Sequence, residues 1–257
     1  MSQALSLDVS DLLTFYGTPN AASVGEFARR LIVQRVRARW QDVRGLRVAG
    51  LGFAPPYLAG FRGEAERVSA FMPARQGSSH WPMGEPSLTA LIDPLDWPVV
   101  DAMFDRVLLV HMLEEAQRPR LTLREAHRVM APNARLMIVV PNRRGTWARF
   151  DTSPFGSGRP YSRGQLTRML GETGFAPVSW SEALHWPPAV ARLGAATTLA
   201  VERVGRFGWA SFSGVIIVEA MKSDAPGLAA LADEQAWSFR WREQLARQPV
   251  GATARGA

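Results

Sequence analysis

His111 is the residue whose type and place best suit proton transfer. It directly follows the apolar run 104–110, which reads as a buried strand, so it is expected at the carboxyl end of a sheet. Ligands of α/β proteins bind at that edge. An imidazole titrates near neutral pH and can take a proton from a substrate group. His111 is therefore the one candidate catalytic base, and the alternative is an ordinary polar residue at a strand end.

A metal site is not predicted. His111 and Glu114 begin a His-Met-Leu-Glu-Glu segment that resembles the zinc-binding pattern H-x-x-E-H, but the second histidine is missing. The chain contains no cysteine, which excludes disulfides, thiolate metal sites and cysteine nucleophiles. The absence of cysteine also fits the expectation of a cytoplasmic protein.

The segment 143–161 combines arginines, aromatic residues and glycines. It follows the apolar run 135–140, so it would overhang the carboxyl ends of the strands, and it is longer than most connections. The residues predicted to bind substrate are Trp147, Arg149, Arg159 and Tyr161, with Gly156 and Gly158 as flexible points. The alternative is a packed loop in which Asp151 pairs with an arginine.

The elements that must position these residues follow from the apolar pattern. Strands are expected at 46–51, 66–71, 87–92, 104–110, 135–140, 177–184 and 214–220. Helices are expected over 23–43, 121–130, 162–174 and 188–206, whereas 1–22 is expected to be irregular. Buried strands that alternate with helices predict a doubly wound α/β fold with a mostly parallel sheet.

Composition and charge exclude several classes of protein. The chain has 257 residues and a formal net charge of +7, and Lys222 is its only lysine. The arginines are spread along the chain instead of forming one block, which favours a solvated basic surface over a nucleic-acid site. The chain has no apolar run of membrane-spanning length and no signal-peptide pattern at its start. We therefore expect neither nucleic acid as a partner nor a membrane span.

The segment 104–142 is more specific than the rest of the chain. It contains Phe-Asp-Arg-Val at 104–107, then His111 with Leu-Glu at 113–114, and then Glu-Ala-His-Arg-Val-Met-Ala-Pro at 125–132. These residues resemble the type 11 group of class I S-adenosylmethionine-dependent methyltransferases, and the resemblance extends over about 46–220. It implies a seven-stranded Rossmann-like sheet with strand one central and the last strand antiparallel, and S-adenosylmethionine as the cofactor.

The element pattern predicts three parts of the chain, and the resemblance implies a set of cofactor-binding residues. Residues 1–45 form an N-terminal helical segment, 46–222 a methyltransferase-like domain with a helical insertion at 186–206, and 223–257 a C-terminal helix and flexible tail. The cofactor would lie against Gly50, Gly52, Phe53 and Ala54 after the first strand, Asp93, Pro94 and Leu95 after the third, and Val110 at the end of the fourth.

The chain departs from the family pattern in two places. Gly50 stands where the family has an acidic residue, and Ala54 and Pro56 replace two glycines of its G-x-G-x-G turn. The second strand leads to Met72 without the carboxylate that holds the ribose in the family. Since each charge-assisted hydrogen bond contributes about 1.5–3 kcal/mol, we expect weak binding of S-adenosylmethionine.

Two functions fit these observations. One is the transfer of a methyl group from S-adenosylmethionine to an unidentified small-molecule or protein acceptor, a reaction that mostly requires orientation and sometimes a base. The other is a catalytically inactive relative that acts as a binding or regulatory subunit within a hetero-oligomer. The preserved segment 104–142 and the long loop favour the enzyme, whereas the altered turn after the first strand favours the inactive subunit.

Overall fold

The computed structural model describes residues 7–17, 23–150, 153–193, 195–208 and 212–223. Its helices are α1 (Val9–Gly17), α2 (Val24–Arg39), α3 (Pro55–Leu58), α4 (Pro119–Val129), α5 (Arg163–Glu172) and α6 (Ala195–Gly208). Its strands are β1 (Arg47–Gly52), β2 (Arg67–Pro73), β3 (Thr89–Ile92), β4 (Phe104–Val110), β5 (Met130–Pro141), β6 (Phe175–Ala183) and β7 (Val215–Lys222). Short 3-10 turns are η1 (Ala59–Phe61), η2 (Trp147–Arg149), η3 (Pro154–Gly156) and η4 (Pro188–Leu193).

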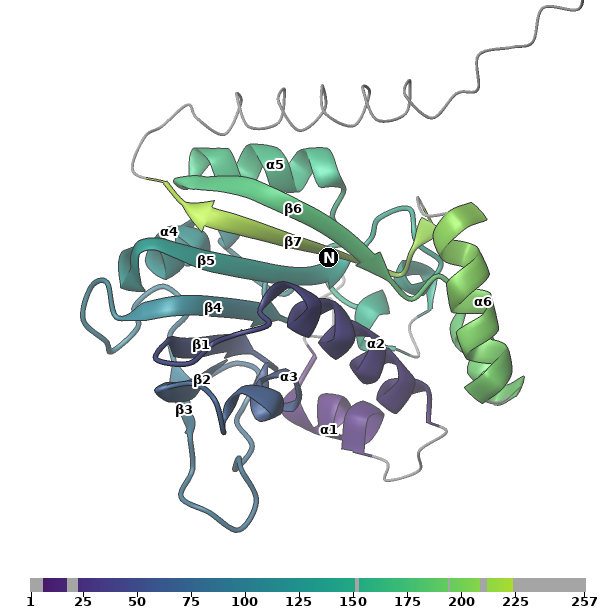
Figure 1. The fold of residues 1–257 in the computed structure, drawn as a ribbon, viewed down its shortest axis with the longest axis horizontal. Helices are drawn as coiled ribbons and strands as arrows, with labels where there is room; N and C mark the ends of the chain where they lie inside the picture. The colour runs from purple at the N-terminus through teal and green to yellow at the C-terminus, as the bar shows by residue number, and fades with distance from the viewer. Residues whose placement is uncertain (1–6, 18–22, 151–152, 194, 209–211, 224–257) are drawn as a thin grey trace, which may run out of the picture.

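The strands form one seven-stranded sheet in the order β3-β2-β1-β4-β5-β7-β6 (Figure 1). The pairs β1–β2, β1–β4, β2–β3 and β4–β5 are parallel, and β7 is antiparallel to both β5 and β6. This arrangement confirms the predicted Rossmann-like fold, including its antiparallel last strand. The middle strand is β4, with β1 beside it, whereas the sequence predicted that the first strand would be central. β1 and β4 end together, because Gly52 pairs with Val110.

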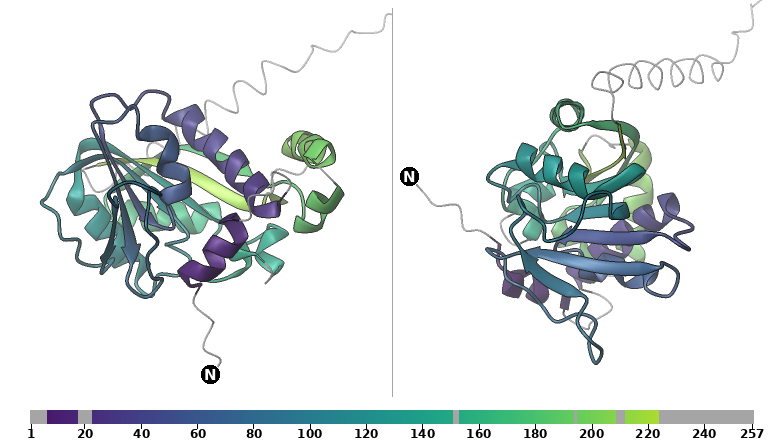
Figure 2. Two further views of the ribbon diagram at one scale, coloured as in Figure 1. Left: turned by 90° about the horizontal axis from the view of Figure 1, so that it is seen from below. Right: turned by 90° about the vertical axis from the view of Figure 1, so that its left-hand side faces the viewer.

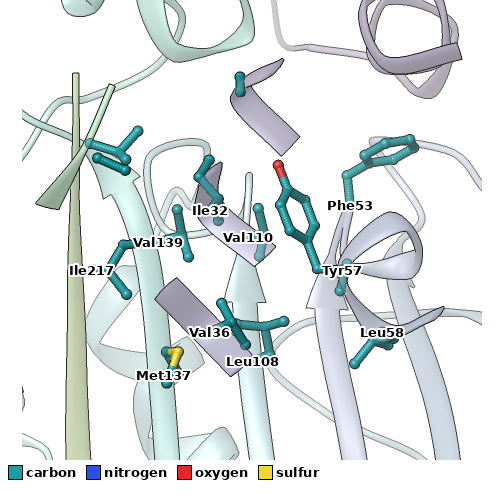
Figure 3. Packing of buried hydrophobic residues seen from close by; sticks show 14 of the residues in the cluster. Ile32, Val36, Phe53, Tyr57, Leu58, Leu108, Val110, Met137, Val139 and Ile217 are labelled. Carbon is teal, nitrogen blue, oxygen red and sulfur yellow. The ribbon is translucent and has the colours of Figure 1, made fainter. Parts of the chain in front are cut away.

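Each face of the sheet buries its own apolar cluster, because successive side chains of a strand point to opposite faces. On one face Leu108 and Met137 pack with α2 residues such as Ile32 and Val36 (Figure 3). On the other face the intervening strand residues pack with α4 and α5. The two helix layers therefore hold the strands in place and leave their carboxyl ends to form the site.

The observed helix ends agree with the predicted ones where capping residues next to the helix mark them. The Ser23 hydroxyl accepts a hydrogen bond from the Glu26 amide at the start of α2, and Ser162 and Gln165 form a complete capping box at the start of α5. Gly174 follows α5 with a φ of 84°, a conformation that glycine adopts without strain.

The structure corrects the expectation of an irregular start for Val9–Gly17. Val9–Gly17 is a helix, and the Asp8 carboxylate accepts hydrogen bonds from the amides of Ser10 and Asp11 at its start, which satisfies free N–H groups of the first turn. The helix α1 packs beside α2 and near η3 (Figure 2). This helix lies over the carboxyl ends of β2 and β4, because the Val9 amide donates to the Gln76 carbonyl and Tyr16 contacts His111.

Three further differences concern element bounds. β5 starts at Met130 rather than 135, and the expected helix over 188–206 divides into η4 and α6. The short helix α3 directly follows β1, where only a turn was expected. The predicted C-terminal helix and tail lie almost wholly outside the described residues. Within the described ranges, no helix has the length and apolar character needed to cross a membrane.

Candidate functional site

A pocket of about 360 Å³ opens at the carboxyl ends of β2, β3 and β4. Its walls are formed by 73–76 at the end of β2, by 92–95 at the end of β3, and by 111–112 and 115–118 after β4, with Leu7 and Thr122 completing them. Doubly wound sheets bind ligands at this edge, and the volume is that of a small-ligand site. The pocket is therefore the candidate binding site.

The pocket combines apolar walls with charges of both signs. Arg75, Asp93, Glu115 and Arg118 line it, together with apolar side chains such as Ile92. Asp93 also holds its own turn, because its carboxylate accepts a hydrogen bond from the Leu95 amide at 2.9 Å. Burial raises the pKa of Glu115, and the nearby carboxylate of Glu114 raises it further. Such walls suit a ligand with a planar apolar part and polar or charged ends.

The sequence-predicted cofactor residues fall into two groups. Asp93, Pro94 and Leu95 line the pocket. Gly50, Gly52, Phe53, Ala54 and Val110 are buried and do not line it.

Close packing of the turn after β1 explains the second group. A Cβ atom on Gly52 would lie 2.3 Å from the Val110 carbonyl oxygen, and the Phe53 amide donates a hydrogen bond to that same oxygen. A Cβ atom on Gly50 would lie 2.4 Å from the Ala54 Cβ. These residues hold the turn directly against β1 and the end of β4. Their small size is therefore explained by close packing of the turn.

His111 lies between the pocket and a buried chain of polar groups. It lines the pocket, yet only 1% of the residue is exposed. The Tyr57 hydroxyl donates to the Tyr16 hydroxyl at 2.9 Å, and the Tyr16 hydroxyl lies 2.6 Å from His111 Nε2. Since the Tyr16 oxygen accepts from Tyr57, its proton points to Nε2, which places the imidazole proton on Nδ1. Nε2 is therefore the basic nitrogen.

Glu114 lies on the other side of His111. Its Oε1 is 3.3 Å from His111 Nδ1, and the side chains of both residues are almost completely buried. Within the described part of the chain, neither carboxylate oxygen of Glu114 accepts a hydrogen bond. The Glu114 carboxylate therefore faces the Nδ1 side of the imidazole, opposite the nitrogen that contacts Tyr16.

The tyrosines of this chain stay protonated. Burial raises the pKa of Tyr16 and of Tyr57 above the ordinary value, and the charge of Glu114 acts in the same direction on both. The two phenols are therefore hydrogen-bond donors at neutral pH.

The four residues predicted to bind substrate lie in two environments. Trp147 is fully buried, packs edge-to-face on Trp186 at 4.9 Å and donates its indole N–H to the Trp186 carbonyl. Tyr161 is also buried, and its hydroxyl donates to the Leu113 carbonyl. Neither residue lines the pocket. Arg149 and Arg159 are exposed, and Asp151, the partner in the packed-loop alternative, lies outside the described residues.

The loop after β5 nevertheless covers the end of β4, as predicted. The Arg159 amide donates to the Glu114 carbonyl, and a Cβ atom on Gly158, whose φ is 72°, would lie 2.7 Å from that same oxygen. The ring of Phe155 lies 4.8 Å from the His111 ring. Sequence reasoning did not assign site roles to Tyr16, Tyr57 and Phe155. Only the fold brings them to His111, although Glu114 could be paired with His111 from its i,i+3 spacing.

No group of three or more histidine, aspartate or glutamate side chains is arranged to hold a metal ion in the ranges that the structure describes. The site therefore offers proton transfer, hydrogen bonding and a pocket of mixed polarity as its chemistry.

Comparisons with known proteins agree with this architecture. Residues 44–138 match the family model described as methyltransferase domain. A search of curated proteins gives no match. A Haloferax volcanii methyltransferase in complex with the Trm112 activator is similar in structure, with a TM-score of 0.57 and 15% identity over 84% of this chain and 98% of that chain.

Two other similar structures show how far this likeness extends. A SAM-dependent methyltransferase from Archaeoglobus fulgidus gives a TM-score of 0.53 and 17% identity over 76% of this chain and 94% of that chain. The [4+2]-cyclase SpnF gives 0.55 and 17% identity over 86% of this chain and 94% of that chain. At such identities the likeness establishes the fold, and the presence of a cyclase shows that the fold alone does not determine the reaction.

Proposed function

We propose that this chain, which carries a methyltransferase domain and has the fold of class I S-adenosylmethionine-dependent methyltransferases, transfers a methyl group from that cofactor to an acceptor. The observation that carries the proposal is the pocket at the ends of β2, β3 and β4 with His111 in its wall. A cofactor pocket and a basic nitrogen with a buried carboxylate behind it are what a methyl transfer to a protonated acceptor requires.

The pocket suits the nucleoside part of the cofactor. Its apolar walls match a planar base, and the carboxylate of Asp93 can accept hydrogen bonds from an exocyclic amino group. Arg75 and Arg118 are the cations among its walls and would bind the carboxylate of the amino-acid part. When bound, S-adenosylmethionine supplies a methyl group on a positively charged sulfur atom.

The turn after β1 supports the expectation of weak binding. The Phe53 amide already donates to the Val110 carbonyl, and Pro55 and Pro56 have no N–H group. This turn therefore offers few donors to a cofactor carboxylate. We propose a dissociation constant in the micromolar range or weaker for this reason.

His111 has the role of catalytic base in this proposal. Its Nε2 takes the proton of the acceptor, and the Glu114 carboxylate stabilises the positive charge that the imidazole gains. The surrounding rings exclude water from both groups, because His111 and Glu114 are buried. Glu114 is a positioning residue that acts through His111.

The alternative function is an inactive binding or regulatory subunit, which the altered turn after β1 favours. The structural neighbour with a Trm112 activator illustrates that a chain of this fold can work in a hetero-oligomer, which is the form this alternative would take. It predicts that neither the cofactor nor its product binds in the pocket.

Calorimetric titration with S-adenosylmethionine and S-adenosylhomocysteine tests the proposal. We expect both to bind the wild-type chain, and we expect Asp93→Ala to weaken S-adenosylhomocysteine about tenfold or more, since it removes a charge-assisted hydrogen bond. Asp96→Ala is the matched control, because Asp96 lies in the same turn but does not line the pocket. Absence of binding to the wild-type chain, or equal loss in both variants, would support the inactive subunit.

A further inference from the structure

Tyr16 places a phenol directly on the nitrogen that the proposed reaction needs. Its hydroxyl is 2.6 Å from His111 Nε2 and accepts a hydrogen bond from Tyr57. Its ring stacks on Phe53 with the centroids 5.6 Å apart and the planes 19° from parallel. The contacts of Tyr16 thus provide an aromatic surface for a ring, a base for its hydroxyl proton and a donor for its oxygen.

The surrounding aromatic rings complete this position. Phe155 lies 4.8 Å from His111 and 6.3 Å from Phe15, the neighbour of Tyr16 on α1. The Tyr57 hydroxyl points away from the apolar residues at the centre of the sheet, such as Leu108 (Figure 3). The described chain therefore encloses the Tyr16 phenol at the junction of α1, β1 and β4.

While α1 is in place, no acceptor can reach the base. Nε2 is occupied by the Tyr16 hydroxyl, and both residues are buried. His111 lines the pocket and Tyr16 does not, so the phenol contacts a residue of the pocket wall without being part of that wall. Access to Nε2 requires Tyr16 to leave, and the position that it leaves has the shape and hydrogen-bonding pattern of a phenol.

We propose that Tyr16 occupies the position of the methyl acceptor, and that the acceptor is a hydroxylated aromatic compound that displaces Tyr16 together with α1. This inference rests on the proposed function. In the reaction the acceptor hydroxyl loses its proton to His111 Nε2, and its oxygen forms a bond to the methyl carbon. The bond between that carbon and the sulfonium sulfur breaks, and the sulfur keeps the electron pair. Phe53 orients the acceptor ring, and Tyr57 donates to its oxygen.

Tyr16 and the acceptor compete for the position beside His111 Nε2, and this competition can be measured. The probe is p-cresol, which is the side chain of tyrosine with a hydrogen in place of the backbone. Tyr16→Phe keeps the ring of α1 but removes its hydrogen bond to His111, so α1 is displaced more easily. We expect the variant to bind p-cresol about tenfold more tightly than the wild-type chain in a calorimetric titration.

Two controls make the result specific. The first is p-xylene, in which a methyl group replaces the hydroxyl. It should bind both proteins more weakly than p-cresol, because it cannot donate to His111. The second is hydrogen exchange of the wild-type chain, in which saturating p-cresol should accelerate exchange of the amides in Val9–Gly17 and leave β4 protected. This second measurement also keeps the proposal testable if Tyr16→Phe folds poorly.

Equal or weaker binding of p-cresol by Tyr16→Phe, or unchanged protection of Val9–Gly17 with p-cresol bound, would overturn the inference. A parallel titration with S-adenosylhomocysteine separates it from the proposed function. If S-adenosylhomocysteine binds and p-cresol does not displace α1, the acceptor class is wrong and the methyltransferase proposal stands. If S-adenosylhomocysteine does not bind, the methyltransferase proposal fails whatever p-cresol does.

Discussion

At the scale of single residues, the end of β4 brings together buried polar side chains and a glycine position that has no room for a side chain. His111 and Glu114 are buried polar groups that serve the proposed chemistry, whereas Gly52 is needed because no side chain fits. The backbone of His111 also has a φ of 50°, in the left-handed region that asparagine tolerates better than most residues. A substitution here must therefore respect the backbone as well as the chemistry.

We expect His111→Asn to keep the fold and to lose the base. General-base catalysis contributes about 10²–10⁴-fold, so kcat for methyl transfer to a phenol should fall by at least about 100-fold. The S-adenosylhomocysteine dissociation constant should change by less than about threefold, because the imidazole does not hold the cofactor in this scheme. Steady-state kinetics and calorimetry measure both quantities. An unchanged kcat would remove His111 from the reaction.

We expect Gly52→Ala to destabilise the chain by about 2 kcal/mol or more. The substitution combines a backbone conformation that L-residues rarely adopt with a clash against the Val110 carbonyl. Gly60→Ala is the control, because a Cβ atom at Gly60 meets nothing within 4 Å. Urea denaturation of both variants gives the free energies of unfolding. Equal stability of the two variants would contradict the packing of the turn described above.

At the scale of elements, the loop after β5 has a buried part and an exposed part. Trp147 and Phe155 are buried against the sheet and α1, whereas Arg149 and Arg159 face solvent. The loop is therefore anchored to the core by its aromatic residues. Its exposed arginines are the part that remains available to a substrate or partner, and substrate binding by Arg149 and Arg159 stays a prediction.

We expect the two parts to respond differently to truncation. Trp147→Ala should lower the free energy of unfolding by about 3–5 kcal/mol, the usual cost of removing a large buried ring. Arg159→Ala should leave it within about 0.5 kcal/mol, because the side chain is exposed and the residue pairs through its backbone amide. Chemical denaturation compares the two. A large loss of stability in Arg159→Ala would favour the packed-loop alternative over substrate binding.

At the scale of the whole molecule, all three tyrosines of the chain are buried. Burial raises the pKa of each above its ordinary value, and for Tyr161 it raises the pKa to about 12. The folded state therefore holds these phenolic protons more tightly than the unfolded state does.

We expect stability to fall at alkaline pH for this reason. Below the unfolded-state pKa of about 10, the three phenols contribute fully to the free energy of unfolding. This contribution is lost as the pH rises towards the folded-state pKa values, and the loss starts between pH about 10 and 12. Tyrosinate absorbance should stay low in the folded chain at pH about 10, where the urea-unfolded chain is half ionised. A folded chain that titrates at the same pH as the unfolded one would contradict the burial of all three rings.

The amino-acid pattern was sufficient to predict the features that depend on short stretches of chain. The apolar runs predicted the seven strands, and the residues Ser23 and Ser162 predicted the starts of α2 and α5, because caps and strand patterns involve neighbouring residues. The segment 104–142 indicated the fold family. His111 was expected at the site because a residue that follows a parallel strand lies at the carboxyl edge of the sheet, and Asp93 was expected there from the family resemblance.

The surroundings of His111 depend on contacts between segments that are far apart in the sequence. Tyr16 is 95 residues away in sequence, and its helix α1 was expected to be irregular because much of its stability comes from packing on the rest of the chain. The burial of Trp147 and of the turn after β1 likewise depends on elements that are distant in sequence. Contacts between distant residues carry no periodic signal in a single chain, so composition and spacing could place a base at the site but could not reveal the phenol that occupies it.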